Sequence, residues 1–194
     1  MSTDFLNKDY EAPVSTGNYM KFKKNGGVKF RVLSNAVTGF EYWNTESRPV
    51  RSPKAWFEMP KDIKLDKDDK PTKIKHFWAF VVWNYEASKV QVLEVTQVSV
   101  RDAIMSHYKE EAWGDPKGYD ITVNSTGVDL DTKYTVVMSP PTPISDEIKA
   151  EYEKLNINLD NLFTGEDPFI NAPKVEEKKE EVDQTDIDPT SIPF

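Results

Sequence analysis

The order of elements in the sequence predicts an all-β fold with accessory helices. An alternating segment, residues 28–33, precedes a long charged insertion, and two segments rich in aromatic and β-branched residues, 75–85 and 89–97, follow as a hairpin. A helical segment comes next, and two further strand-like segments, 119–123 and 134–138, complete the pattern. Five strands with a helix between the third and fourth is the order of an OB-fold barrel. An immunoglobulin-like sandwich would need about seven strands and no central helix.

In the first predicted strand, Val28, Phe30 and Val32 alternate with Lys29 and Arg31. A period of two puts the apolar side chains on a core face and both cations on the opposite face. The segment 39–43 looks like a continuation of this strand past a bend at Ser34-Asn35. After it, residues 44–73 carry four prolines among alternating lysines and aspartates, which predicts a charged insertion loop without regular elements.

The pairing register of this hairpin decides which aromatic residues face the core. With a three-residue loop, residues 86–88, Tyr85 pairs with Lys89. Trp78 and Phe80 then lie on the face away from the core. The core face is formed by Ala79, Val81, Leu93 and Val95. A register shifted by one residue reverses the two faces, and this alternative stays open.

Two helices are expected from capping signals. Ser99 and Asp102 have the capping-box spacing, and the helix that they begin should end near Trp113, before Gly114-Asp115-Pro116. Ser145 should cap a second amphipathic helix.

Length and composition suggest one domain with a tail. The chain has 194 residues, of which 38% are hydrophobic and 30% charged. Residues 174–194 contain seven acidic residues, three lysines and almost no apolar surface, which is typical of a disordered segment. The predicted organisation is an N-terminal arm (1–27), an OB-fold domain (28–170) with the charged insertion (44–73) and an extra helix (145–158), and an acidic tail (171–194).

The net charge of -8 hides an asymmetry. Residues 1–76 contain fifteen Lys and Arg against ten Asp and Glu, a net charge of +5, so that the remainder carries -13. A polyanionic partner is therefore compatible with the first part of the chain.

Catalytic and metal sites find little support in the sequence. The chain has no Cys and two His, and it has neither a Gly-rich phosphate loop nor a Gly-x-Ser-x-Gly motif. We expect no enzyme activity, no metal and no cofactor. No apolar run is long enough to cross a membrane, and the N-terminus does not resemble a signal peptide, so the expected location is the cytoplasm.

A binding surface has more support. Lys29 and Arg31 on one strand, with Trp78 and Phe80 on another, would supply the cations and aromatic rings that a single strand of nucleic acid requires. The alternative is that these aromatics are core residues and the cations only keep the protein soluble.

The chain ends in an acidic run with an apolar tip, residues 186–194. In the body of the chain, four stretches have a particular order and spacing: 19–21 before 29–33, then 39–43, then 90–96, and last 114–116 leading to 119–121. In these stretches the chain resembles phage single-stranded DNA-binding proteins, and its end looks like the acidic Ile-Pro-Phe terminus of bacterial single-stranded DNA-binding proteins. Two features differ from the family: Pro189-Thr190-Ser191 interrupts the acidic run, and the absence of Cys removes a zinc site that some related proteins carry.

The resemblance implies an OB-fold that coats and protects single-stranded DNA, independent of sequence, in phage replication, recombination or repair, located in the cytoplasm of the host cell. From the residues and the resemblance together we expect DNA contacts from Lys29, Arg31, Phe40, Tyr42, Trp43, Trp56, Lys73, Lys75, Trp78 and Phe80. Replication or recombination proteins would bind the tail through Asp186, Ile187, Asp188, Ile192, Pro193 and Phe194. The alternative function is an OB-fold assembly module that binds protein or oligosaccharide.

Overall fold

The computed structural model describes residues 17–127 and 131–170. The predicted tail contacts and most of the predicted N-terminal arm lie outside these ranges. The strands are β1 (Tyr19–Met20), β2 (Gly26–Val32), β3 (Val37–Trp43), β4 (Pro49–Ser52), β5 (Lys75–Asn84), β6 (Lys89–Val95), β7 (Asp120–Thr126) and β8 (Lys133–Met138). The helices are α1 (Val98–Lys109), α2 (Asp146–Glu153) and α3 (Asn161–Thr164), with a short 3-10 helix at Pro116–Gly118.

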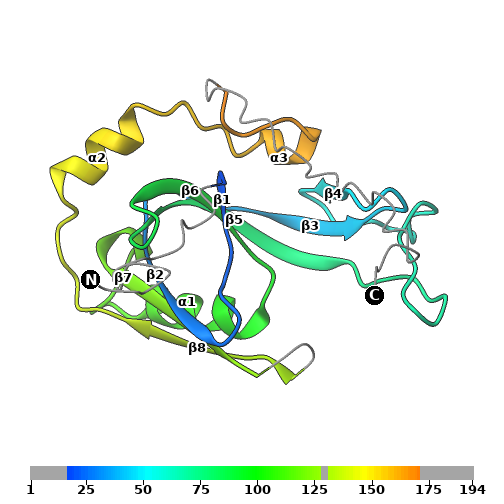
Figure 1. Cartoon of the computed structure of the whole chain (residues 1–194), viewed down its shortest axis with the longest axis horizontal. Coiled ribbons are helices and arrows are strands. Elements are labelled where there is room, and N and C mark those ends of the chain that lie inside the picture. Colours follow the sequence, from blue (N-terminus) through cyan, green and yellow to red (C-terminus); the bar gives the residue numbers. More distant parts are fainter. Residues whose placement is uncertain (1–16, 128–130, 171–194) are drawn as a thin grey trace, which may run out of the picture.

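The strands form one curled, mixed sheet (Figure 1). Its order is β1-β6-β5-β2-β7-β8, and β3 pairs with both β4 and β5. The β1–β6 pair is parallel and the other pairs are antiparallel. The predicted all-β class with accessory helices is therefore confirmed. A closed five-stranded barrel is not, because no strand pairing within the described ranges joins β8 to β6 or β1.

The predicted continuation of the first strand past a bend is confirmed. β2 pairs with residues 82–84 of β5, and β3 pairs with residues 75–79 of the same strand. Between them, Leu33 donates its N–H to the Val81 carbonyl at 2.8 Å, and the Ser34 hydroxyl accepts the Val81 N–H at 2.9 Å. Beyond this bend, β3 and the first half of β5 project from the body (Figure 1). We call β3, β4 and residues 75–79, with the loops between them, the extension.

The predicted register of the β5–β6 hairpin is wrong by one residue. Asn84, not Tyr85, is opposite Lys89, so that Phe80 is opposite Leu93. The cause is a turn closed by the Asn84 side chain, whose Oδ1 accepts the N–H groups of Glu86 at 3.0 Å and Ala87 at 3.3 Å. Phe80 is consequently a core residue, with 3% of its surface exposed.

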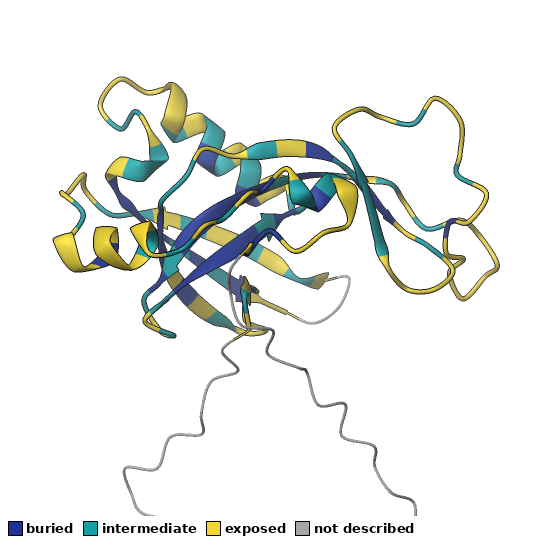
Figure 2. Cartoon of the chain, turned by 90° about the horizontal axis from the view of Figure 1, so that it is seen from above, coloured by how far each residue is buried: buried dark blue, intermediate teal, exposed yellow. Residues whose placement is uncertain are grey.

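Both faces of β5 at residues 79–82 and of β6 at residues 90–93 are buried (Figure 2). Inside the curl, residues such as Phe30, Val82 and Leu93 pack against α1. On the outside, the C-terminal segment packs against these strands through three buried residues, Leu159, Leu162 and Phe169. An alternating pattern cannot show which face is the core when the two faces are both covered.

The helices follow the predictions in part. Ser145 caps α2 as predicted, because its Oγ accepts the Ile148 N–H at 3.4 Å. The expected extra helix 145–158 is shorter, since α2 ends at Glu153. The predicted capping box of α1 is wrong: Gln97 is the N-cap residue, and its side chain makes no capping bond. α1 also ends at Lys109 rather than near Trp113, because Glu110 is already extended.

The insertion is more regular than predicted. β4 pairs with β3, and isolated β-bridges join Asn44 to buried Ile63 and Leu65 to Pro71. The Asn44 Oδ1 accepts the backbone N–H groups of Glu46 and Arg48, which closes the turn between β3 and β4. The alternating charges of this segment gave no sign of the short hairpin, whose turn is closed by the Asn44 side chain.

Candidate nucleic-acid interface

A groove of about 340 Å³ opens between the extension, the bend after β2 and α1. Trp78 and the half-exposed ring of Tyr108 line it, with Phe80 and Ile104 among the buried apolar residues beneath. We call it the aromatic groove, and its lining is Val32, Ser34, Asn35, Ala36, Thr38, Trp78, Phe80, Ile104, Met105, Tyr108, Asp115 and Pro116. Such a volume is in the range of sites that hold small organic groups, roughly 300–1,000 Å³.

The pairing of β3 with β5 continues this surface along the extension. Thr38 is opposite Trp78 and Phe40 is opposite His76, so these four side chains share one face. The rings of Phe40 and His76 meet edge to face, with their centroids 5.1 Å apart. An aromatic strip therefore leads from the aromatic groove onto the extension.

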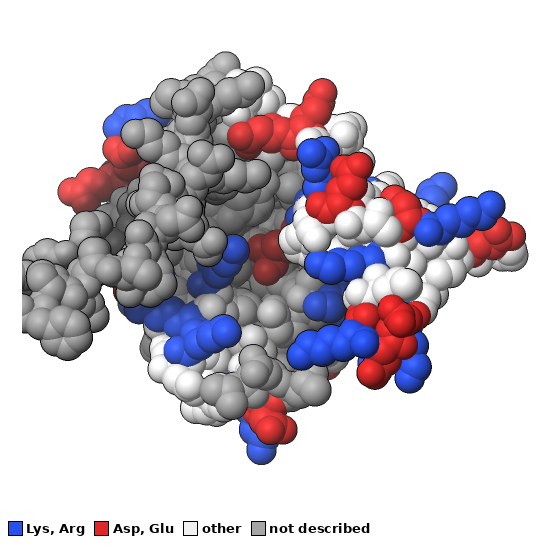
Figure 3. Space-filling model, turned by 45° about the vertical axis from the view of Figure 1, so that its right-hand side comes forward, with Lys and Arg blue, Asp and Glu red and all other residues white. Residues whose placement is uncertain are grey.

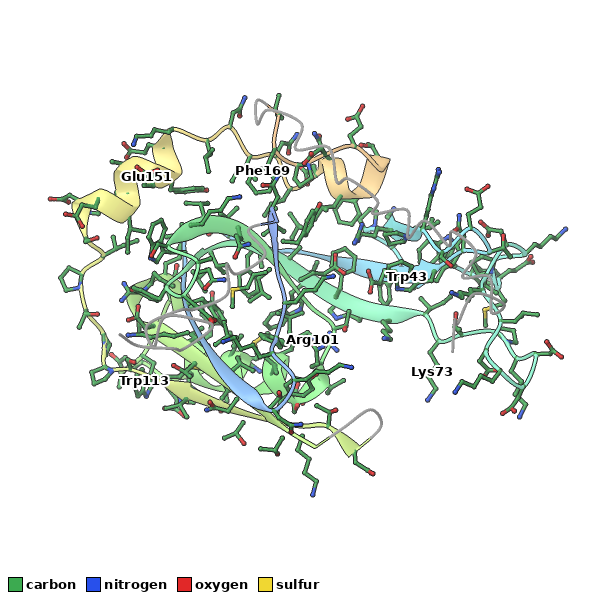
Figure 4. The ribbon with its side chains drawn as sticks, viewed as in Figure 1. Trp43, Lys73, Arg101, Trp113, Glu151 and Phe169 are labelled. Carbon is green, nitrogen blue, oxygen red and sulfur yellow. The ribbon has the colours of Figure 1, made fainter. Side chains whose placement is uncertain are left out.

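Arg101 supplies a permanent positive charge beside this strip. It projects from α1, one turn before Met105, and one guanidinium nitrogen, Nη1, contacts Nδ1 of His76. Because Arg is a donor only, His76 accepts this contact in its neutral form. Burial, and then the charge of Arg101, lower the pKa of His76. In Figure 4, Arg101 and Lys73 lie on the same side of the β5 ribbon.

The structure brings five of the predicted aromatic residues to this one face of the extension and groove. Phe40, Trp78 and Phe80 are described above. Tyr42 is buried, its hydroxyl donates to Asp62 at 2.8 Å, and the ring of Trp56 packs edge to face on it at 4.9 Å. The remaining aromatic residue, Trp43, is 45% exposed on the opposite face of the extension, as the strand alternation requires.

The predicted cations are scattered. Lys73 is exposed in the loop before β5, and Lys75 lies opposite Glu41, on the face that also carries Trp43. Lys29 and Arg31 lie on the outer face of β2, which points away from the interior of the curl. They do not belong to the aromatic groove.

The expectation that Arg31 lies on an open face is wrong, because its side chain is 2% exposed. Its Nε donates to Asp120 Oδ1 at 2.6 Å, and its two terminal nitrogens donate to the carbonyl and hydroxyl of Thr142 at 3.0 Å. Lys29 Nζ lies 2.9 Å from the other oxygen of Asp120, and the Tyr85 hydroxyl donates to Oδ1. Burial by itself would raise the pKa of Asp120, but hydrogen bonds from Lys29, Tyr85 and Arg31 outweigh it and lower that pKa.

Most of the site was not predicted: among the residues that line the aromatic groove only Trp78 and Phe80 were expected, and the polar residues His76, Arg101, Asn35 and Asp115 were not. Arg101, Met105 and Tyr108 occupy positions i, i+4 and i+7 of a helix, which places them on one face. This spacing was visible in the sequence. The proximity of that face to Trp78 was not, because it depends on how α1 packs across the sheet.

No known protein family, curated protein or solved structure matches this chain. Residues 17–127 and 131–170 contain no group of three or more His, Cys, Asp or Glu side chains placed to hold a metal ion. Among the same residues, no helix combines the length and apolar character needed to cross a membrane.

On the opposite face of the extension, the buried carboxyl of Glu41 lies near the partly buried Glu94 of β6. Arg51 Nη2 lies 2.7 Å from Glu94 Oε2, and Arg51 Nε lies 3.5 Å from Glu41 Oε2. Burial, followed by a hydrogen bond and repulsion from Glu94, raises the pKa of Glu41 to about 8, although Arg51 and Lys75 oppose this shift. Between pH 4.5 and about 8, the native protein thus keeps a proton on Glu41, whereas the unfolded chain, in which the pKa of this group is 4.5, releases it.

This proton predicts a loss of stability with rising pH. The contribution of Glu41 is complete below pH 4.5 and is lost as the pH rises toward about 8. The Glu41→Gln variant cannot ionise, so the difference between its melting temperatures at pH 5 and pH 8.5 should be smaller than in the wild type. The exposed Glu58→Gln variant is the control and should behave as the wild type does. An equal pH dependence in Glu41→Gln and wild type would contradict the proposed protonation.

Proposed function

We propose that this chain is a single-stranded DNA-binding protein that coats DNA independently of sequence and has no enzymatic activity of its own. The observation that carries this proposal is the aromatic groove with Arg101 at its side and the aromatic strip leading from it. Bases stack on aromatic rings whatever their identity, at roughly 1–3 kcal/mol per base, while cations neutralise the phosphates. A groove that offers rings and a fixed cation together suits a flexible polyanion with exposed bases.

The proposed fold is an OB-fold, and the strand connections support it. β2 lies between β5 and β7, β5 pairs with β6, β7 pairs with β8, and α1 connects β6 to β7. β1 and the residues after it span the gap between β6 and β8: Met20 of β1 is opposite Leu93 of β6, and the Phe22 ring is 5.7 Å from that of Tyr134 in β8. The extension then corresponds to a long loop between the first and second strands of the barrel.

The distribution of charge supports a path for the phosphates. Residues 44–73 contain eight Lys and Arg against six Asp and Glu. With the extension turned forward, Figure 3 shows Lys and Arg side chains on either side of the recessed centre of the visible face, with an acidic side chain within it. Cations on the extension would contact the phosphates of a DNA strand that extends beyond the groove, and they would add to the electrostatic attraction between protein and DNA.

A binding titration tests the proposal. Fluorescence anisotropy of a labelled dT oligonucleotide should show binding that weakens as salt increases. Arg101→Ala should flatten the dependence of log K on log salt by ~0.7 if Arg101 contacts one phosphate, and Arg101→Lys should restore it. Lys149→Ala, which removes an exposed cation of α2, is the matched control and should keep the wild-type slope.

Two results would count against DNA binding. One is the absence of oligonucleotide binding at low salt by a folded protein. The other is a salt-insensitive change in Trp fluorescence on adding an oligosaccharide or protein ligand, which the alternative assembly module predicts. Either result would assign the aromatic groove to a different class of ligand.

We also propose that the acidic tail recruits replication or recombination enzymes. Support comes from its sequence, an anionic segment that is apolar only at Ile192-Pro193-Phe194. A partner with a basic, partly apolar pocket could bind this tip while the body of the protein holds DNA.

A further inference from the structure

A polar corner closes one end of the aromatic groove, where the bend after β2 meets the 3-10 helix. Lys117 Nζ donates to Asn35 Oδ1 at 2.7 Å and lies 3.2 Å from Asp115 Oδ2. Asn35 and Asp115 both line the groove. One ammonium group therefore holds an amide and a carboxylate next to each other at its edge, although these residues are 80 positions apart in the sequence.

The hydrogen-bonding capacity of this corner follows from its partners. Lys117 has only donors, so Asn35 presents its oxygen to the ammonium and directs its NH₂ group elsewhere. Asp115 is an acceptor only. Its Oδ1 accepts the backbone N–H of Lys117 at 2.9 Å, and the carboxylate retains further lone pairs. The corner thus offers a donor and an acceptor in adjacent positions.

An adjacent donor and acceptor is also what every unpaired nucleobase presents on its Watson–Crick edge. Thymine has N3–H beside O4, and cytosine has N3 beside its N4 amino group. In a duplex the complementary base occupies this edge, whereas proteins that recognise single strands bind it directly. Stacking on Trp78 cannot distinguish one base from another, but hydrogen bonds to this edge distinguish an unpaired base from a paired one.

We infer that the polar corner binds the Watson–Crick edge of one unpaired base that stacks in the aromatic groove, so that Asn35 and Asp115 make the protein select single strands over duplexes. This inference rests on the proposed DNA-binding function and adds a specificity-determining site to it. Asp115 would accept the N3–H of thymine or the amino group of cytosine, and the Asn35 amide would donate to the neighbouring acceptor. Every base can satisfy this pair in one orientation, so the selection does not impose a sequence.

An oligonucleotide of N3-methylthymidine isolates this contact. It has the same phosphate charge as dT and a similar ring for stacking, but a methyl group replaces the N3–H. The wild-type protein should bind it roughly fivefold to tenfold more weakly than dT, in line with the lower end of base-edge contacts. Asp115→Ala should bind the two oligonucleotides almost equally, whereas Asp115→Asn, whose amide oxygen still accepts the N3–H, should keep part of the discrimination.

The matched control is Asp146→Ala, which removes an exposed carboxylate paired with a lysine on α2, outside the groove. It should discriminate as the wild type does. Circular dichroism at the assay temperature confirms that each variant is folded, and the pair of Asp115 variants guards against a local rearrangement in one of them.

The outcomes separate this inference from the function on which it rests. Equal binding of dT and methylated oligonucleotide by the wild type would overturn the inference alone, and so would undiminished discrimination by Asp115→Ala. Absence of any dT binding by the folded wild type would overturn the DNA-binding function, and the inference with it.

Discussion

Asp120→Ala should destabilise the protein by about 3–5 kcal/mol, the usual cost of removing one member of a buried ion pair. The substitution leaves the Arg31 guanidinium, 2% exposed, with Thr142 as its only remaining hydrogen-bond partner of those described. A charge buried in this way has neither water nor a counter-ion to compensate it. Urea denaturation followed by circular dichroism measures the effect as a lower midpoint with an unchanged slope.

Two further variants show whether the loss belongs to the buried pair. Lys29→Ala removes the half-exposed partner of Asp120 and should cost at most about 1 kcal/mol, since exposed ion pairs contribute little. Arg31→Met combined with Asp120→Ala should be milder than Asp120→Ala alone, because no unpaired charge remains. If Asp120→Ala proves no more destabilising than Lys29→Ala, then Arg31 finds another partner and the network is not a structural centre.

Trp78→Ala should weaken binding of a dT oligonucleotide by ~1–3 kcal/mol, which is about fivefold to 150-fold in affinity. Trp78 lines the aromatic groove and lies between Phe80 and His76 on one face of β5. Removing the indole takes away the largest ring on which a base could stack, while Trp78→Phe keeps a ring and should retain most of the affinity. Anisotropy of a labelled oligonucleotide measures both variants without relying on Trp fluorescence.

Trp43→Ala is the matched control for this prediction. Trp43 belongs to the same extension and is 45% exposed, but its side chain lies on the opposite face. We expect its affinity for dT to remain within about twofold of the wild type, a difference of roughly 0.4 kcal/mol. Loss of affinity in Trp43→Ala but not in Trp78→Ala would place the DNA on the other face of the extension.

Local signals in the sequence predicted much of the fold. Alternation between apolar and basic residues located β2, and Ser145 located the start of α2. The hairpin register failed on one residue, since Asn84 closes the turn with its side chain, and apolar spacing carries no information about such a bond. The faces of β5 failed for a different reason: the face of Phe80, which was expected to be open, is buried inside the curl against α1, and the C-terminal segment covers the opposite face of Ala79 and Val81 as well.

The candidate site, like the fold, could be predicted from the sequence only in part. Trp78 was expected on a binding face, but from a hairpin register that is wrong by one residue, and the register of β3 with β5, which puts Phe40 and Trp78 on one face, has no signal in the sequence. Arg31 could not be interpreted correctly, because a basic residue in an alternating strand looks the same whether it meets solvent or a buried carboxylate. Asn35 and Asp115 meet only through Lys117, across a bend and a turn that have no periodic signal.

The C-terminal segment also limits the route that a ligand can take across the molecule. Leu159, Leu162 and Phe169 are 3–8% exposed against the outer surface of β5 and β6. Uncovering side chains of this kind costs about 1.5–3 kcal/mol each. The chain therefore occludes this surface with its own residues, and a polymer that bound across it would first have to displace the segment.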